Sequence, residues 1–197
     1  MGKGNVAVID IKSSAVLQSL HKKAETTVAS PYGQNCDGIA FVDTCSDGPT
    51  HPDIIVTASY DDSVRVWDTD GKLFREQKLG GVNRLAISPC RRYVLVSVNH
   101  MLVSKSEIPK VQIYDLPSGQ CLCGLHGCGL RSVGPICWSP DGESVSAGAS
   151  DGRAYVWYVS RTKLPRSEDV KTMEDVRQIQ QERHRLEGHD DFVVALG

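Results

Sequence analysis

A short strand-like segment recurs four times along the chain of 197 residues. The copies read VAVID at 6–10, VRVWD at 64–68, VQIYD at 111–115 and AYVWY at 154–158. In each copy apolar residues alternate with others, which is the pattern of a strand with one buried face. The last residues of successive copies lie 58, 47 and 43 positions apart, and the two shorter spacings match the roughly 40–45 residues of a four-stranded propeller blade. The spacing therefore predicts an all-β repeat architecture.

The flanks of these segments repeat as well. Apolar runs at 54–59 and 144–149 precede two of the copies, and each run ends in a turn that contains Asp, at 60–63 and at 150–152. Two further apolar strands, 85–89 and 136–140, end at a Ser-Pro turn, where the missing proline N–H costs no ladder hydrogen bond. Another strand follows two of the copies, at 72–79 and 120–125. Each repeat is therefore predicted to hold four strands.

This pattern resembles the WD-repeat β-propeller family. The resemblance is carried by the segment SYDDSVRVWD at 59–68, by Asp151 followed by Val156-Trp157, and by the pair Gly188-His189. It implies an all-β propeller segment with about three complete four-stranded blades, partial blades at both ends and an incomplete ring. The blades are expected at 36–79, 81–126 and 133–187, the last with a charged insertion at about 160–183, and the partial blades at 1–23 and 188–197. The whole of 1–197 is thus expected to be a single partial propeller, and the open ring predicts a fragment or truncated member, since propellers close with roughly four to eight blades.

The resemblance also assigns signature residues to the repeat. In the family, the His of a Gly-His pair bonds a Ser or Thr, the turn Asp and the strand Trp of one repeat. No repeat of this chain has the whole set. The Trp67 repeat has Thr57 but no Gly-His pair before it, and the Trp157 repeat has Ala147 in place of the Ser or Thr. We expect each missing hydrogen bond to cost about 1 kcal/mol, and we expect equivalent surroundings for Trp67 and Trp157. The signature residues are Thr57, Asp61, Trp67, Asp68, Asp115, Asp151, Trp157, Gly188 and His189.

The residues that could carry chemistry have simpler structural interpretations. Thiol and imidazole groups suit zinc, but the Cys-x-Cys spacing predicts two thiols on one strand face. The favoured interpretation is that Cys121, Cys123 and Cys128 pack between blades and that His126 lies in a turn. Turn positions explain Asp61, Asp62 and Asp151 without catalysis. The sequence has no nucleophile-elbow or zinc-helix motif. We predict a protein that is not an enzyme, with no catalytic residue, no metal and no cofactor.

Two segments depart from the repeat and are candidates for partner contact. The loop 99–109 lengthens a turn of the middle blade, and it is predicted either to bind a partner or to form a disordered stretch or an extra hairpin. The insertion carries a partial apolar stripe, which fits a solvated helix, a disordered segment or a partner-docking helix, at Val170, Met173, Val176 and Ile179. The candidate partner-binding residues are Tyr60, Asp62, His100, Met101, Lys105, Arg131 and Arg153.

Charge and hydropathy narrow the class of protein. The 22 Lys and Arg residues against 24 Asp and Glu residues argue against a direct nucleic-acid binder. No apolar run suits a signal peptide or a membrane span, so an intracellular protein, cytoplasmic or nuclear, is expected. We predict a non-catalytic scaffold or adaptor that binds other proteins or peptides within a multiprotein complex. The alternatives are a substrate-recognition subunit of a ubiquitin ligase and, from another class, an enzyme built on a propeller.

Overall fold

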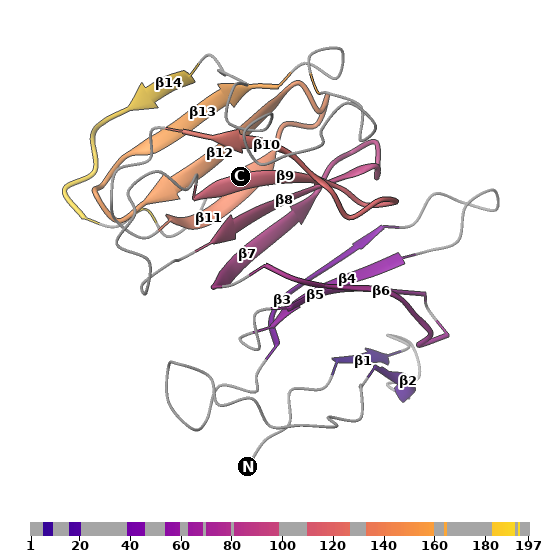
Figure 1. Ribbon diagram of the computed structural model, residues 1–197. Coiled ribbons are helices and arrows are strands. Elements are labelled where there is room, and N and C mark those ends of the chain that lie inside the picture. The colour runs from indigo at the N-terminus through magenta and orange to yellow at the C-terminus, as the bar shows by residue number, and fades with distance from the viewer. Residues whose placement is uncertain are drawn as a thin grey trace. The chain divides into compact units, whose positions relative to one another are not determined.

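The computed structural model describes a part of the chain that consists of strands and short connections (Figure 1). No helix in this part is long and apolar enough to cross a membrane. The strands are β1 Val6–Ile9, β2 Val16–Leu20, β3 Ile39–Cys45, β4 Ile54–Ser59, β5 Ser63–Asp68, β6 Leu73–Lys78, β7 Val82–Ile87, β8 Tyr93–Val98, β9 Val111–Asp115, β10 Cys121–Leu125, β11 Val133–Trp138, β12 Ser144–Ala149, β13 Ala154–Tyr158 and β14 Arg183–Leu186. The described residues are 6–9, 16–20, 39–45, 54–59, 63–68, 70–79, 81–98, 110–126, 133–159, 164, 183–191 and 193.

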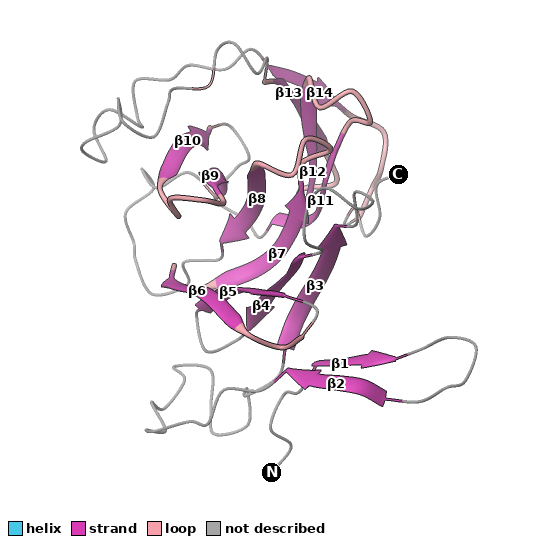
Figure 2. Cartoon of the chain, turned by 90° about the vertical axis from the view of Figure 1, so that its right-hand side faces the viewer, coloured by secondary structure: helices cyan, strands magenta, loops and turns pink. Residues whose placement is uncertain are grey.

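Three sheets of four strands account for most of these residues, and the strands of each sheet follow one another in the chain. Their orders are β3-β4-β5-β6, β7-β8-β9-β10 and β11-β12-β13-β14, and β1 and β2 form a separate pair. Figure 2 shows the strands without any helix between them. The predicted all-β fold class, with three four-stranded blades and a partial one, is confirmed. The residue boundaries of the blades stay predictions.

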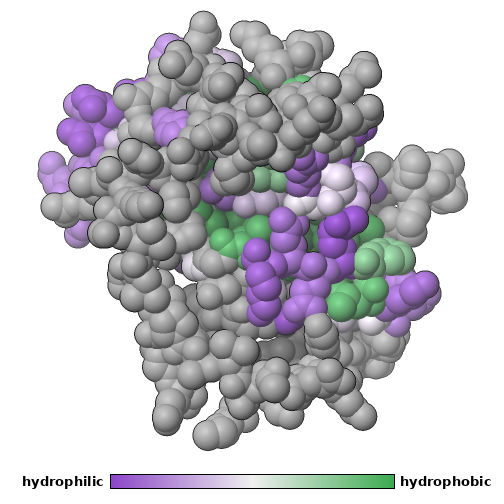
Figure 3. Space-filling model, viewed as in Figure 1, coloured by the Kyte–Doolittle hydropathy of each residue, from purple (hydrophilic) through white to green (hydrophobic). Residues whose placement is uncertain are grey.

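The chain divides into two compact units, Met1–Val82 and Asn83–Gly197. The first unit holds the β1–β2 pair and the sheet β3–β6, and the second holds the other two sheets apart from the first residue of β7. The described surface mixes purple hydrophilic and green hydrophobic side chains (Figure 3). In the first unit the most exposed large apolar side chain among the described residues is Phe74, at 52%, and the Lys72 ammonium lies 5.9 Å from the centre of its ring.

Register makes the three four-stranded sheets comparable residue by residue. The second and third strands of each sheet pair so that Trp67, Tyr114 and Trp157 lie opposite Ile55, Val94 and Val145. All three rings are buried. The alternation found in the sequence thus places one aromatic ring at the same point of each sheet, as a half-buried strand requires.

The Ser-Pro turns are built alike in the two sheets of the second unit. Ser88 Oγ accepts a hydrogen bond from the Tyr93 N–H at 3.0 Å, and Ser139 Oγ accepts one from the Ser144 N–H at 2.9 Å. The residue three positions after each serine has positive φ, 59° at Arg91 and 73° at Gly142. Glycine suits this left-handed conformation, whereas Arg91 is strained in it.

Three side-chain hydrogen bonds tie the sheets β7–β10 and β11–β14 together. Asn83 Nδ2 donates to the Val133 carbonyl at 2.7 Å, and Trp138 Nε1 donates to the Ala86 carbonyl at 3.1 Å. Trp157 Nε1 donates to the carbonyl of His126 at 3.1 Å. In the sheet β7–β10, every residue of β9 and β10 is buried, whereas β7 is partly exposed. The second unit is therefore one packed body of two sheets.

Candidate partner-binding site

The aromatic ring of each sheet finds a different hydrogen-bond acceptor. Trp67 Nε1 donates to Thr57 Oγ1 at 3.0 Å, within its own sheet. The equivalent of Thr57 is Val96 in the next sheet and Ala147 in the last, and neither can accept. The Tyr114 hydroxyl instead donates to Gln112 Oε1 at 2.6 Å, and Trp157 donates across to the preceding sheet.

The prediction for Trp157 was therefore partly wrong. Its position in the sheet matches that of Trp67, but its surroundings differ, because Ala147 leaves the indole N–H free to reach the His126 carbonyl. The expected loss of a hydrogen bond does not occur at this ring. A backbone carbonyl of the neighbouring sheet replaces the missing hydroxyl, and a sequence motif gives no signal for such an acceptor.

Cys121 and Cys123 lie on opposite faces of β10, contrary to the prediction of a shared face. A register shift between them pairs Cys121 with Tyr114 and Cys123 with Ile113, which are neighbours on β9. Burial raises the pKa of Cys121 to about 11, so its thiol is neutral at neutral pH. Zinc ligands converge on one point, whereas the register with β9 directs these two thiols to opposite faces of the strand. His126 is exposed, and Cys128 lies outside the described residues.

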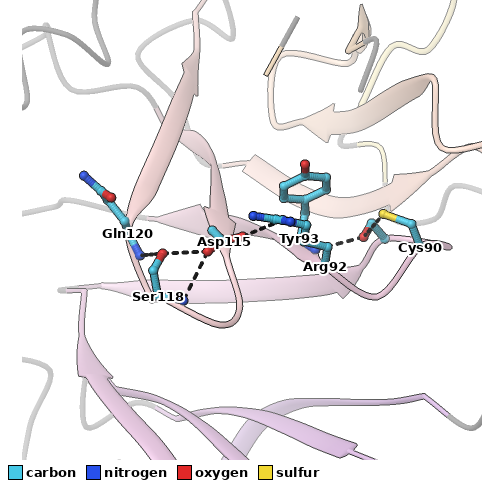
Figure 4. A network of polar contacts seen from close by, with 7 residues as sticks. Cys90, Arg92, Tyr93, Asp115, Ser118 and Gln120 are labelled. Carbon is cyan, nitrogen blue, oxygen red and sulfur yellow. Dashed lines mark hydrogen bonds and ion pairs between the residues drawn. The ribbon is translucent and has the colours of Figure 1, made fainter. Parts of the chain in front are cut away.

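Asp68 and Asp115 cap the turns that follow their strands. Asp68 Oδ1 accepts the Lys72 N–H at 2.7 Å. Asp115 is buried, and its Oδ2 accepts the N–H of Ser118 at 3.1 Å and the hydroxyl of Ser118 at 2.6 Å (Figure 4). Its other oxygen pairs with Arg92 Nε at 3.0 Å. The structure thus gives both carboxylates a turn-stabilising position, as Asp commonly has.

The described partner-binding candidate is Arg153, in the turn region between β12 and β13. Its Nη1 lies 3.3 Å from Asp151 Oδ2 and its Nε lies 3.0 Å from Glu187 Oε1, while 38% of the side chain is exposed. Glu187 also pairs with Arg185 Nη2 at 2.7 Å. The hydrogen bonds to Glu187 and Asp151 raise the pKa of Arg153, so its charge is fixed. The signature residue Asp61 lies outside the described residues. So do the other partner-binding candidates, Tyr60, Asp62, His100, Met101, Lys105 and Arg131.

Asp151 is hydrogen-bonded to both Arg153 and Tyr155. It accepts the Tyr155 hydroxyl at 2.8 Å and the Arg153 N–H at 3.2 Å. Burial raises the pKa of Asp151, but the hydrogen bonds from Tyr155 and Arg153 outweigh burial and leave the pKa below its usual value. The carboxylate is therefore ionised at neutral pH and anchors Arg153 through two bonds.

The Gly188-His189 pair passes along the same edge. A Cβ on Gly152 would lie 2.5 Å from the His189 carbonyl oxygen, so the two segments are in close contact. Farther on, Val193 is buried, its N–H lies 3.4 Å from the Ala149 carbonyl, and its side chain fills the space beside Gly148. The β12–β13 turn and the described residues of 187–193 thus contact each other along one edge. The loop 99–109 and the apolar stripe of the insertion lie outside the described residues.

Sequence comparison shows what this chain is similar to. Residues 26–68 and 119–158 match the family described as "WD domain, G-beta repeat". Nuclear distribution protein PAC1 from Arthroderma otae and the same protein from Trichophyton verrucosum are each 28% identical over 127 residues, which are 61% of this chain and 27% of the relative. Target of rapamycin complex subunit LST8-1 from Arabidopsis thaliana is 27% identical over 111 residues, which are 53% of this chain and 32% of the relative. The chain spans about a third or less of these relatives.

Proposed function

Because the chain belongs to the WD-repeat β-propeller family, we propose that it acts as a non-catalytic scaffold or adaptor within a multiprotein complex. Its partners are other proteins or peptides, bound at the edge where the β12–β13 turn meets residues 187–193. The name of LST8-1, a complex subunit, supports membership of a complex. The proposal includes an intracellular location, cytoplasmic or nuclear, as the sequence predicts.

The observation that carries the proposal is the fixed and exposed guanidinium of Arg153. Its bonds to Glu187 and Asp151 use Nε and Nη1, and Nη2 carries two further N–H donors. A side chain that is already held by two carboxylates loses little conformational entropy when a partner binds. Arginine is also enriched among the residues that dominate binding energy. Arg153 therefore suits recognition of a carbonyl or carboxylate on a partner.

A quantitative affinity purification tests this function. Tagged wild-type chain, Arg153→Ala and the control Lys72→Ala are used to recover partners from cell extract, and the recovered proteins are quantified by mass spectrometry. Lys72 is a suitable control because it is an exposed cation on the other unit. We expect Arg153→Ala to lower partner recovery at least about tenfold, which corresponds to about 1.4 kcal/mol, and Lys72→Ala to leave it unchanged.

Two results would contradict the proposal. Equal recovery by Arg153→Ala and wild type, with equal melting temperatures, would remove this edge as the binding site. Recovery of no specific protein by the wild-type chain would remove the scaffold function itself.

A further inference from the structure

Two arginine side chains converge on a single carboxylate oxygen at the edge that carries Arg153. Glu187 Oε1 lies 3.0 Å from Arg153 Nε and 2.7 Å from Arg185 Nη2. The two guanidinium nitrogens therefore cannot be farther apart than these two distances combined. The side chains of Arg153 and Arg185 are 38% and 51% exposed, so both cations are open to solvent. Two like charges this close repel each other, and the shared carboxylate offsets that repulsion.

The pairing of β13 with β14 brings the two arginines together. Leu186 pairs with Ala154 in the ladder between these strands. Glu187 follows Leu186 and Arg153 precedes Ala154, so the carboxylate and the guanidinium lie beside each other where the two strands meet the turn. Arg185 belongs to β14 itself and extends from a paired strand. The convergence is thus set by the register of the sheet.

The shared carboxylate leaves donors of both arginines available. Arg153 has a second carboxylate, since Asp151 Oδ2 lies 3.3 Å from its Nη1. Among the described residues, the ion pair with Glu187 is the one that Arg185 makes, and Nε and Nη1 of Arg185 carry further N–H donors. The Glu187 side chain is 53% exposed, so it can rotate into water without burying its charge. Glu187 therefore occupies a place that an anion with more charge and more oxygens can take.

We propose that Arg153 and Arg185 form a binding site for a phosphate group on a partner protein, and that Glu187 occupies this site until the phosphate displaces it. The inference rests on the proposed function, because it names the chemical group that a partner presents at this edge. A phosphate monoester carries a charge of about −1.5 to −2 at neutral pH and three acceptor oxygens, whereas a carboxylate carries a single charge and two oxygens. Each guanidinium can then bond to oxygens of its own, and bonds between arginine and phosphate are frequently bidentate.

Convergence of the arginines, and not net charge, gives the site its selectivity. Acidic residues are as common as arginines at this edge, since Asp190 and Asp191 follow Glu187 and are exposed. Long-range attraction of anions to the edge is therefore weak. A carboxylate on a partner is also a poor competitor, because Glu187 already supplies a carboxylate at high effective concentration. We therefore expect a phosphate to bind here much more tightly than a carboxylate.

An NMR titration of the purified chain of 197 residues tests the site, because the Nε–H signal of an arginine reports contact with an anion. The probes are the end-blocked peptides Gly-phosphoserine-Gly, Gly-Glu-Gly and Gly-Ser-Gly at constant ionic strength. The phosphoserine peptide should shift the Arg153 and Arg185 signals saturably, with a dissociation constant on the order of millimolar, and the glutamate peptide should bind at least about tenfold more weakly. Arg92 is the matched control in the same spectrum, since its side chain is 54% exposed and pairs with the carboxylate of Asp115.

Two variants separate binding from a structural role of the cluster. Arg185→Ala removes one guanidinium and should weaken binding of the phosphoserine peptide at least about fivefold. Glu187→Gln removes the competing carboxylate and should tighten that binding about threefold or more. Loss of a merely structural ion pair would not give opposite effects of this kind. Circular dichroism checks that both variants are folded.

Each outcome decides the inference. Saturable shifts at Arg153 and Arg185, with opposite effects of the two variants, support it. It is overturned by the absence of saturable shifts, by equal binding of the glutamate peptide, by equal shifts at Arg92, or by Glu187→Gln that leaves binding unchanged or weaker.

Failure of this inference is distinguishable from failure of the proposed function, because the titration contains no partner protein. Treating the cell extract with a protein phosphatase before the affinity purification separates the two in the other experiment. Partner recovery that Arg153→Ala lowers and that dephosphorylation leaves unchanged would uphold the scaffold function and overturn the phosphate site. Recovery that both treatments lower supports the phosphate site.

Discussion

The hydrogen bond between Trp67 and Thr57 allows the contribution of a single repeat residue to be measured. Both side chains are buried, 5% and 3% exposed, and their bond is 3.0 Å long. Thr57→Val replaces the hydroxyl by a methyl group of similar size, so the change removes the acceptor without opening a cavity. The indole N–H is then buried without a partner, which costs about 1–3 kcal/mol. We expect the free energy of unfolding to fall by about 2 kcal/mol, the middle of that range.

Urea unfolding followed by tryptophan fluorescence measures this loss. With a urea dependence of about 1–3 kcal/mol per molar for a small protein, the midpoint should shift by roughly 1 M. Thr57→Ser keeps the acceptor and is the control for the lost methyl group. In a Trp67→Phe background the donor is already absent, so Thr57→Val should then cost almost nothing, and the double-mutant cycle should give a coupling energy of about 1–2 kcal/mol. A coupling energy near zero would refute the assignment of this bond as a stabilising contact.

Four further predictions concern turns, thiols and packing. Gly142→Ala should lower the stability by about 1 kcal/mol because φ is 73° there, and Arg91→Gly, at φ 59°, should raise it by a similar amount in thermal unfolding. Ser97→Ala should stabilise the fold by about 1 kcal/mol in urea unfolding, because the Ser97 hydroxyl is buried without a hydrogen-bond partner. Burial raises the pKa of Cys121 from 9.0 to about 11. The stabilising contribution of this thiol is therefore complete below pH 9 and falls as the pH rises toward 11. Urea unfolding at about pH 8 and about pH 10 should show this loss of stability in the wild type and not in Cys121→Ala. Gly152→Ala should displace the segment after β14, since the new Cβ would lie 2.5 Å from the His189 carbonyl oxygen, and faster limited proteolysis of that segment would report the change.

The sequence predicted the positions of strands better than the partners of side chains. Period-two alternation and Ser-Pro turns are local signals, and they located the four-stranded sheets and the aromatic ring on the third strand of each. The two-residue spacing of Cys121 and Cys123 was misleading, because a bulge in the ladder with β9 reverses the face of one of them. A bulge depends on how two strands pair, so one strand's sequence does not reveal it.

The candidate site was only partly predictable for a related reason. Asp151 and Arg153 were identified from a turn, and the structure places them together by a 3.3 Å ion pair. Glu187 and Arg185 complete the cluster from β14 and the residue after it, more than 30 positions along the chain. Neither residue belongs to a sequence motif, and their part in the cluster depends on the pairing of β13 with β14. The charge pattern of the insertion gave no signal for that pairing.

The three aromatic rings show why this repeat tolerates loss of its signature. What each position requires is an acceptor for a buried N–H or O–H, and the chain meets that requirement with a hydroxyl for Trp67, an amide oxygen for Tyr114 and a backbone carbonyl for Trp157. The third solution differs in kind, because its acceptor belongs to the neighbouring sheet. A bond within a sheet stabilises that sheet alone, whereas the bond of Trp157 also opposes separation of the two sheets. Replacing Thr57 is therefore expected to weaken its own sheet alone. At Ala147, the tryptophan N–H bonds to the neighbouring sheet and not within its own sheet. Degeneration of the signature can therefore stiffen the second unit, whose β12–β13 turn carries Arg153.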